Sequence, residues 1–242
     1  MQQLAHSLAA ELVPPPRPGP GICPICRTWN DQPDEVVCSN CAHVEEVLYE
    51  PALTLDVITL YRKPSPLRDW LTSYKGRLDD SEPYIPAYEH NIRAMVWQFF
   101  ADHSQRLVER CGGLDCLVVV PSTQRTPPHP LENVLATIDL PAPVIPLLVR
   151  GPGELDFNKP ALDGYDASSD HPPQRVLLVD DVYTTGARIN SAATALRRAG
   201  HTVTGAFVIA RRVRPEFHPD AQALWDRQVE AGFSWSNGPV VS

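Results

Sequence analysis

The sequence predicts an α/β protein built on a parallel sheet, with a small cysteine-rich module near its N-terminus. From residue 117 to residue 210, strand-like apolar runs alternate with helix-like segments, a pattern typical of parallel strands joined by helices. One of these runs, residues 176–179, is wholly apolar, as expected for a strand buried on both faces. Two Cys-x-x-Cys pairs precede this region, which indicates a separate module.

The bulk composition fits one large domain, or one standard domain with a small module. The chain has 242 residues, 43% of them hydrophobic, and a net charge of −8. This charge argues against a general nucleic-acid or membrane-surface binder, while a local basic groove stays open. No stretch approaches the ~20 apolar residues of a membrane span, and residues 1–13 do not resemble a signal peptide. We therefore expect a cytoplasmic protein whose cysteines are metal ligands or free thiols.

Four cysteines form two Cys-x-x-Cys knuckles separated by eleven residues. Two knuckles supply the four sulfur ligands of a tetrahedral structural zinc site, which has no open position for water. A redox pair needs only one knuckle and usually lies in a βαβ unit. We predict that zinc is bound by Cys23, Cys26, Cys38 and Cys41. Cys111 and Cys116 lack the knuckle spacing and are expected to be packed thiols.

The chain divides into three predicted parts. Residues 1–21 combine a short helix-like stretch (4–13) with a Pro-rich run, and we expect a flexible tail and linker. Residues 22–43 form the zinc-binding module, and residues 44–242 form the α/β domain. The segments expected in this domain are helices at 44–49, from Ser65-Pro66, at 87–111, 129–138 and 188–199, extended runs at 53–61, 117–120, 144–149, 176–179 and 202–210, and a Gly/Pro-rich loop at 150–174. Pro146 places the strand at 144–149 at an edge or weakens it.

Asp180 and Asp181 follow the apolar strand, and a turn with two hydroxyls and a glycine comes next. Ligands of parallel α/β sheets bind beyond the carboxyl ends of the strands. Backbone N–H groups and hydroxyls of such a turn, together with the N-terminus of the next helix, can hold a phosphate. Two carboxylates would repel a phosphate unless a metal intervened, so they are better explained as acceptors for a sugar diol. The run therefore indicates a site for a ribose 5-phosphate.

Other proteins also place acidic residues after an apolar strand. A P-loop ATPase needs a Gly-Lys pair, and the sequence contains none. A receiver domain begins with its acidic pair and needs well over the 61 residues that follow Asp181. A merely structural strand, turn and helix is the alternative that remains.

The run from Val176 to Arg188 resembles, over its whole length, the phosphoribosyl pyrophosphate (PRPP) signature of type I phosphoribosyltransferases. The resemblance implies that Asp180 and Asp181 bind the ribose 2- and 3-hydroxyls while the turn wraps the 5-phosphate. It also implies that the turn after the first core strand binds pyrophosphate, although an ordinary strand end would look similar. The implied PRPP-binding residues are Asp180, Asp181, Val182, Tyr183, Thr184, Thr185, Gly186, Ala187, Ser122 and Thr123. Magnesium would arrive with PRPP, held by its diphosphate, hydroxyls and waters.

The order of the motifs over residues 23–212 resembles the ComF family of phosphoribosyltransferase-like proteins, which is associated with DNA uptake in naturally competent bacteria. The motifs are the four-cysteine module, a helix ending in Tyr74-Lys75-x-Arg77, a Val-Pro turn and the PRPP signature. The chain departs from this family at residues 127–133, where Pro-Pro-His-Pro-Leu-Glu-Asn replaces an Arg-Gly-Phe-Asn-like segment. The departure weakens any transfer of the acceptor or of a role in DNA uptake.

Two functions from different classes remain open. As an enzyme, the chain would be a glycosyltransferase of the phosphoribosyltransferase type, acting on PRPP and an unidentified nitrogen acceptor, with Asp180 and Asp181 as the catalytic pair. Arg150 or Lys159 of the 150–174 loop could then neutralise the departing pyrophosphate, or each could be a solvated surface residue. As an adaptor, the chain would sense PRPP or a nucleotide without catalysis, and its zinc module would bind a protein or nucleic-acid partner.

Overall fold

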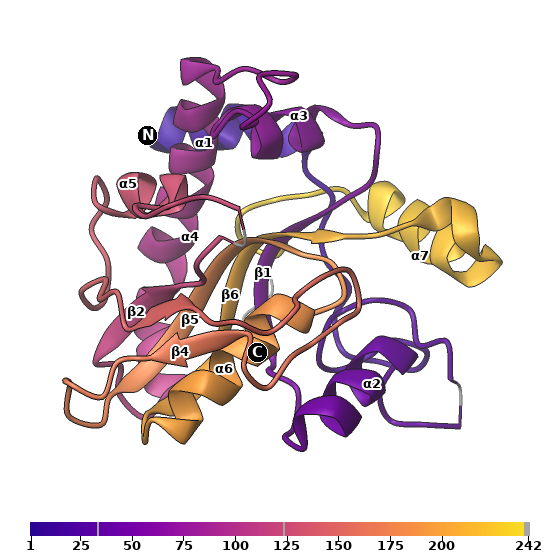
Figure 1. Cartoon of the computed structure of the whole chain (residues 1–242). Helices are drawn as coiled ribbons and strands as arrows, with labels where there is room; N and C mark the ends of the chain where they lie inside the picture. The colour runs from indigo at the N-terminus through magenta and orange to yellow at the C-terminus, as the bar shows by residue number, and fades with distance from the viewer. Residues whose placement is uncertain (33, 123, 240–242) are drawn as a thin grey trace.

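A four-stranded parallel sheet forms the centre of the protein in the computed structural model, which describes residues 1–32, 34–122 and 124–239. The strand order is β1 (Leu55–Tyr61), β6 (Thr202–Arg212), β5 (Arg175–Tyr183) and β2 (Cys116–Val119). Helices lie on both sides of this sheet (Figure 1). The predicted α/β class with a parallel sheet flanked by helices is confirmed. Within the described residues, no helix combines the length and apolar character needed to span a membrane.

Each face of the sheet has its own apolar core, because successive strand residues point to opposite faces. Leu177 and Val179 of β5 pack in the cluster that holds α1 (Gln2–Leu8), α3 (Pro66–Ser73), α4 (Pro86–Arg110) and α5 (Pro130–Leu135). Val176 and Leu178 pack in the cluster beneath α2 (Ser39–Leu48) and α6 (Ala187–Arg198). A smaller cluster joins β1 to α7 (Pro219–Ala231) through Leu60 and Trp225. The side chains on both faces of β5 are thus buried along most of the strand.

The helices α3 and α5 both begin at capped residues. Ser65 caps α3, since its hydroxyl accepts the backbone N–H of Arg68 at 3.2 Å and proline occupies the first turn. His129 caps α5, because its Nδ1 accepts the N–H of Leu131 at 3.2 Å while Glu132 accepts the N–H of His129 at 3.2 Å. These caps set where each helix begins.

The N-terminal segment is packed, so the expectation of a flexible tail is wrong for it. Residues 2–11 form α1 and a short 3-10 turn, and Ala5 and Leu8 are buried in the core. The indole N–H of Trp235 donates to the carbonyl of Ala5 at 2.9 Å. The residues from Pro14 to Pro16 are buried as well, at a small entropic cost because proline has little freedom to lose. The boundaries at residues 21 and 43 stay a prediction.

The segment between β2 and β5 differs from the expected strand and loop. Leu148–Arg150 (β3) pairs antiparallel with β4 (Tyr165–Ala167) in a separate two-stranded sheet. Val144 forms only an isolated bridge to Leu117 of β2. Pro146 has no N–H for a ladder, which explains why the strand predicted at 144–149 is interrupted. The loop at 150–174 therefore contains strand β4.

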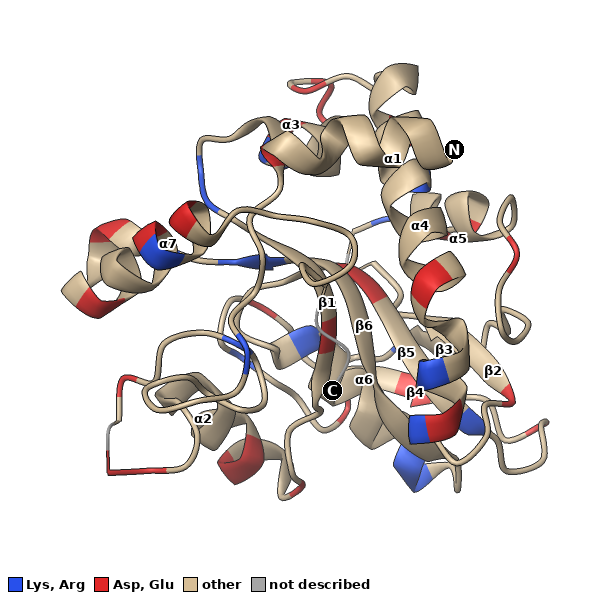
Figure 2. Cartoon of the chain, turned by 180° about the vertical axis from the view of Figure 1, so that it is seen from behind, with Lys and Arg blue, Asp and Glu red and all other residues tan. Residues whose placement is uncertain are grey.

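Removing the buried Asp56 should destabilise the protein strongly. Asp56 of β1 is fully buried and forms an ion pair with Arg110 at the end of α4, and Figure 2 shows an acidic position inside β1. Asp56→Ala would leave a partly buried guanidinium without this partner, at a cost of about 3–5 kcal/mol. The control Glu154→Ala, which breaks the exposed pair with Lys159, should cost less than about 1 kcal/mol. Urea unfolding measures both, and equal costs would contradict this account.

Candidate functional site

A cavity of about 590 Å³ lies at the carboxyl end of β5. β2 pairs with β5 only as far as Val179, so within the described part of the chain no strand pairs with the last four residues of β5 on that side. Asp180 and Asp181 therefore lie inside β5, further along it than the strand predicted at 176–179. The cavity is lined by residues 180–189, by Ser122 and Gln124 after β2, and by parts of α3 and of the 155–157 segment.

The structure gathers the predicted PRPP-binding residues that it describes around this one cavity. They are Asp180, Asp181, Val182, Tyr183, Thr184, Thr185, Gly186, Ala187 and Ser122. Thr123 lies outside the described residues. The role of each residue in binding PRPP stays a prediction.

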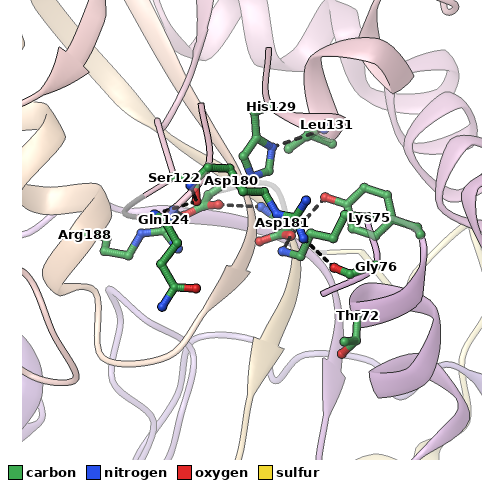
Figure 3. Close-up of polar contacts among 12 residues, drawn as sticks. Thr72, Lys75, Gly76, Ser122, Gln124, His129, Leu131, Asp180, Asp181 and Arg188 are labelled. Atoms are coloured by element: carbon green, nitrogen blue, oxygen red, sulfur yellow. Dashed lines mark hydrogen bonds and ion pairs between the residues drawn. The ribbon is translucent and has the colours of Figure 1, made fainter. Parts of the chain in front are cut away.

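The two carboxylates face different partners (Figure 3). The Oδ2 atom of Asp181 accepts a hydrogen bond from the Tyr74 hydroxyl at 3.0 Å and forms an ion pair with Lys75. The Oδ1 atom of Asp180 accepts the N–H of Asp181 at 2.9 Å, and its Oδ2 lies 3.6 Å from the Arg188 guanidinium. Both carboxylates are almost completely buried. One acid is thus held by the end of α3 and the other by the start of α6.

These surroundings drive the two acids to ionise at different pH values. Burial raises the pKa of Asp180 to about 6, although the Arg188 charge opposes the rise. Burial acts on Asp181 in the same direction, but the Lys75 ammonium and the other positive groups around it, Arg188 among them, together outweigh burial and hold the pKa of that carboxyl well below its usual range. Asp181 is therefore charged throughout the physiological range, while Asp180 takes up a proton in mildly acidic solution.

The turn after β5 is shaped to receive an anion. Gly186 has a φ of +88° and is the N-cap of α6, and a Cβ there would lie 2.2 Å from the Tyr183 hydroxyl. Only glycine fits this position without displacement. The first residues of α6 line the cavity, so the partial positive charge of the helix N-terminus acts there. The hydroxyl of Thr185 also accepts the N–H of Asn158 at 3.1 Å, which attaches the 155–158 segment to the turn.

The cavity is basic although the protein as a whole is acidic. Six cations line it, against four acidic residues: Lys63, Arg68, Lys75, Arg77, Arg125 and Arg188, against Asp79, Asp156, Asp180 and Asp181. Arg125 donates to the carbonyl of Gly76 at 2.5 Å, and the Ser122 hydroxyl accepts the N–H groups of Gln124 and Arg125 at 3.1 Å. Such a lining suits a ligand with several negative charges.

Sequence reasoning assigned no role to Arg125 or Arg188, and it named Tyr74 and Lys75 only as part of a motif. Arg188 directly follows the predicted turn, which is a signal that could have found it. The two loop cations are engaged elsewhere: Arg150 donates to the carbonyl of Gly151 at 2.8 Å and to those of Gly153 and Gly164. Lys159 is largely exposed and pairs with Glu154. Lys75, Arg125 and Arg188 line the cavity, whereas Arg150 and Lys159 are not among its lining residues.

The four knuckle cysteines form a buried cluster whose Sγ atoms all lie within 4.8 Å of one another. The Sγ atoms are 3.8 Å apart in the pair Cys23–Cys41 and 3.5 Å apart in the pair Cys26–Cys38. A disulfide needs ~2.05 Å, and all four cysteines are free thiols. A tetrahedral ion with metal–sulfur bonds of ~2.3 Å places its sulfurs ~3.8 Å apart. The cluster therefore fits a four-coordinate metal ion, whereas Cys111 and Cys116 are buried outside it.

Replacing Asp180 with Asn should stabilise the protein more at pH 7 than at pH 4. The carboxyl has a pKa of about 6 in the folded protein, above its ordinary 3.8, so the folded state binds the proton more tightly than the unfolded state. Wild-type stability is therefore lost as the pH rises through this window, and neutral Asn avoids the loss. The difference should reach about 2–3 kcal/mol, and urea unfolding at both pH values measures it. A stabilisation that does not change with pH would contradict the assignment.

Comparisons with known proteins identify no family for this chain. No protein-family model matches it, and no curated protein matches it. Among solved structures, the chain is similar to adenine phosphoribosyl transferase from Trypanosoma brucei in complex with AMP, pyrophosphate and ribose-5-phosphate. The identity is 15%, the match covers 62% of this chain and 81% of that one, and the TM-score is 0.32. A likeness this remote carries no functional weight, and the site rests on its own geometry.

Proposed function

We propose that the chain is a type I phosphoribosyltransferase, which transfers the phosphoribosyl group from PRPP to a nitrogen acceptor and releases pyrophosphate. The observation that carries this proposal is the lining of one cavity. Two buried carboxylates lie beside a Thr-Thr-Gly turn at a helix N-terminus, with six cations around them. Carboxylates accept hydrogen bonds from a sugar diol, and the turn and the cations attract phosphates. PRPP combines these groups in one molecule.

In the proposed reaction, the bond between C1 of the ribose and the pyrophosphate oxygen breaks, a bond from C1 to the acceptor nitrogen forms, and that nitrogen loses a proton. Asp180 and Asp181 hold the ribose hydroxyls, and their negative charge stabilises the positive charge that develops on the ring. The turn at Thr184 to Ala187 anchors the 5-phosphate. Arg125 and Arg188 balance the charge of the leaving pyrophosphate. Magnesium bound with PRPP would neutralise part of the diphosphate charge.

A second candidate is a ComF-like adaptor that binds PRPP or a nucleotide without catalysis. One observation favours it: Asp181 already has the Lys75 ammonium and the Tyr74 hydroxyl as partners. A ribose diol that displaced them would move the end of α3. Ligand binding would thereby become a conformational signal, and the cysteine module would engage a protein or nucleic-acid partner.

We also propose that the four-cysteine cluster holds one zinc ion. Cysteine sulfurs are preferred zinc ligands, and the measured spacing matches a tetrahedral set. Four sulfur ligands leave no position for water or substrate, so the ion would stabilise the N-terminal module and take no part in group transfer.

Substitutions at the diacid should weaken PRPP binding. Asp180→Asn and Asp181→Asn should each lower the affinity roughly ten- to a hundredfold, because a hydrogen bond to a charged group contributes ~1.5–3 kcal/mol. Gly186→Val should abolish binding, since its side chain would collide with Tyr183. Calorimetry with magnesium and PRPP measures all three variants, and the exposed Asp226→Asn on α7 is the control. Equal affinities for wild type and both diacid variants would refute the site.

Measuring pyrophosphate release distinguishes the enzyme from the adaptor. A screen of nitrogen bases and amines for PRPP-dependent pyrophosphate release should identify an acceptor if the chain is an enzyme. Binding of PRPP without release for any acceptor, together with PRPP-dependent capture of a partner, would instead establish the adaptor.

Purified protein should contain one zinc ion per chain. Cys38→Ser should lose it and lower the stability of the N-terminal module, because structural zinc in small modules binds with an apparent ~10–16 kcal/mol. Cys111→Ser, outside the cluster, should keep the full zinc content. Elemental analysis and thiol titration measure both variants. Wild-type protein that lacks zinc and has freely reactive knuckle thiols would contradict the metal site.

A further inference from the structure

Arg211 connects the cysteine cluster to the turn that we propose binds phosphate. Arg211 lies near the end of β6, opposite Tyr183 of β5, and it is only 4% exposed. Its Nε donates to the carbonyl of Cys26 at 3.0 Å, and one of its terminal nitrogens lies 3.8 Å from the Cys26 sulfur. Figure 2 shows basic residues at this end of β6. The guanidinium thus touches a member of the metal-binding cluster directly.

The buried charge of Arg211 requires a negative partner. Among the described residues, no carboxylate forms an ion pair with it, and its remaining hydrogen bonds go to the carbonyls of Tyr183 and Arg212. An unpaired charge in a protein interior is costly, so the counter-charge must come from the cluster itself. Four thiolates around a divalent ion carry a net charge of −2, which a neighbouring guanidinium balances in part.

The other side of Arg211 meets the ligand site. Its guanidinium lies 5.0 Å from the centre of the Tyr183 ring, in cation–π geometry. Tyr183 is buried, and its hydroxyl occupies the space next to Gly186, where a Cβ would come within 2.2 Å of it. A cavity of about 240 Å³ that is lined by Cys38, Arg211, Thr184 and Thr185 shows how close the cluster and the turn are. A continuous line of contacts therefore runs from Cys26 through Arg211 and Tyr183 to Gly186.

We propose that Arg211 is a positioning residue that couples metal occupancy of the cysteine cluster to the shape of the Thr184–Ala187 turn. When the metal leaves, the buried thiolates take up protons from water and become neutral thiols, which removes the counter-charge of Arg211. The guanidinium must then move or take up water, and the Tyr183 ring that supports the turn moves with it. The cluster would thereby control ligand binding although it holds no ligand. The inference deepens the proposed function, and it rests on that function only in naming PRPP as the ligand.

Coupling between two binding sites is reciprocal, which provides the test. If zinc favours the turn that binds PRPP, then PRPP must favour retention of zinc. In wild-type protein we expect saturating PRPP with magnesium to slow the transfer of zinc to a coloured chelator by about fivefold or more, against magnesium alone. Arg211→Met should release zinc faster, and at the same rate with and without PRPP.

A second variant tests the contact between Arg211 and Tyr183, and a third serves as a control. Tyr183→Leu leaves Arg211 beside the cluster but removes its aromatic contact. It should retain one zinc per chain and lose the effect of PRPP on zinc release at a PRPP concentration that calorimetry shows to saturate this variant. The exposed Arg227→Met on α7 is the matched control and should behave like wild type. Circular dichroism checks that each variant is folded. Full retention of the PRPP effect in both Arg211→Met and Tyr183→Leu would overturn the proposal.

A ligand-free measurement separates this proposal from the proposed function. Hydrogen exchange of residues 183–188 should be faster in Arg211→Met than in wild type, by roughly tenfold, and unchanged in Arg227→Met. If PRPP fails to bind wild-type protein, the proposed function is lost, but this exchange result still decides whether Arg211 supports the turn. Equal exchange in Arg211→Met and wild type would show that it does not.

Discussion

Asp180 and Asp181 bury two carboxylates next to each other at the end of β5, and the surrounding elements are arranged to compensate that charge. Each acid is at most 3% exposed. A buried charge without a partner costs several kcal/mol, so opposite charges must be close. Lys75 comes from the end of α3 and Arg188 from the start of α6, and each approaches one of the acids. The diacid thus ties segments that lie more than a hundred residues apart in sequence to one point of the fold.

The strand itself separates the two acids. Successive residues of β5 point to opposite faces of the sheet, so Asp181 meets α3 while Asp180 meets α6. Because β2 ends at Val119, the same stretch of β5 is open to a cavity on its free side. The parallel sheet supplies three things at one place: two differently ionising acids, an open edge and a helix N-terminus. That combination suits a ligand that carries both a diol and a phosphate.

The sequence predicted those features of the fold that depend on residues close together in the chain. Ser65-Pro66 marked the start of α3, and the apolar run at 176–179 with its acidic pair marked the strand and turn, because caps and strand ends depend on neighbouring residues. Lys75 was missed as a partner of Asp181, since only the tertiary fold brings the end of α3 to β5. Arg188, the partner of Asp180, directly follows the predicted turn and could have been found from the sequence. The packing of the N-terminal segment with its proline-rich run was also missed. Composition indicates that such a run is extended, but whether it packs depends on the surface that the rest of the fold presents to it.

The contacts of Asp181 bear on the choice between an enzyme and an adaptor. Both Tyr74 and Lys75 contact Oδ2, and their position leaves Oδ1 as the atom that a ribose hydroxyl could reach. A hydroxyl donates one hydrogen bond and accepts others, so it could donate to Oδ1 while accepting from the Lys75 ammonium. The ion pair therefore need not break when a diol binds, and its presence does not favour the adaptor as strongly as a blocked carboxylate would.

An enzyme differs from an adaptor in what it must do at the pyrophosphate end of PRPP. There, positive charge must stabilise the leaving group. In the proposed enzyme, Arg125 beside Ser122 and Arg188 beside Asp180 would supply that charge. The effect of these two residues on pyrophosphate release, more than that of the diacid, decides between transfer and sensing.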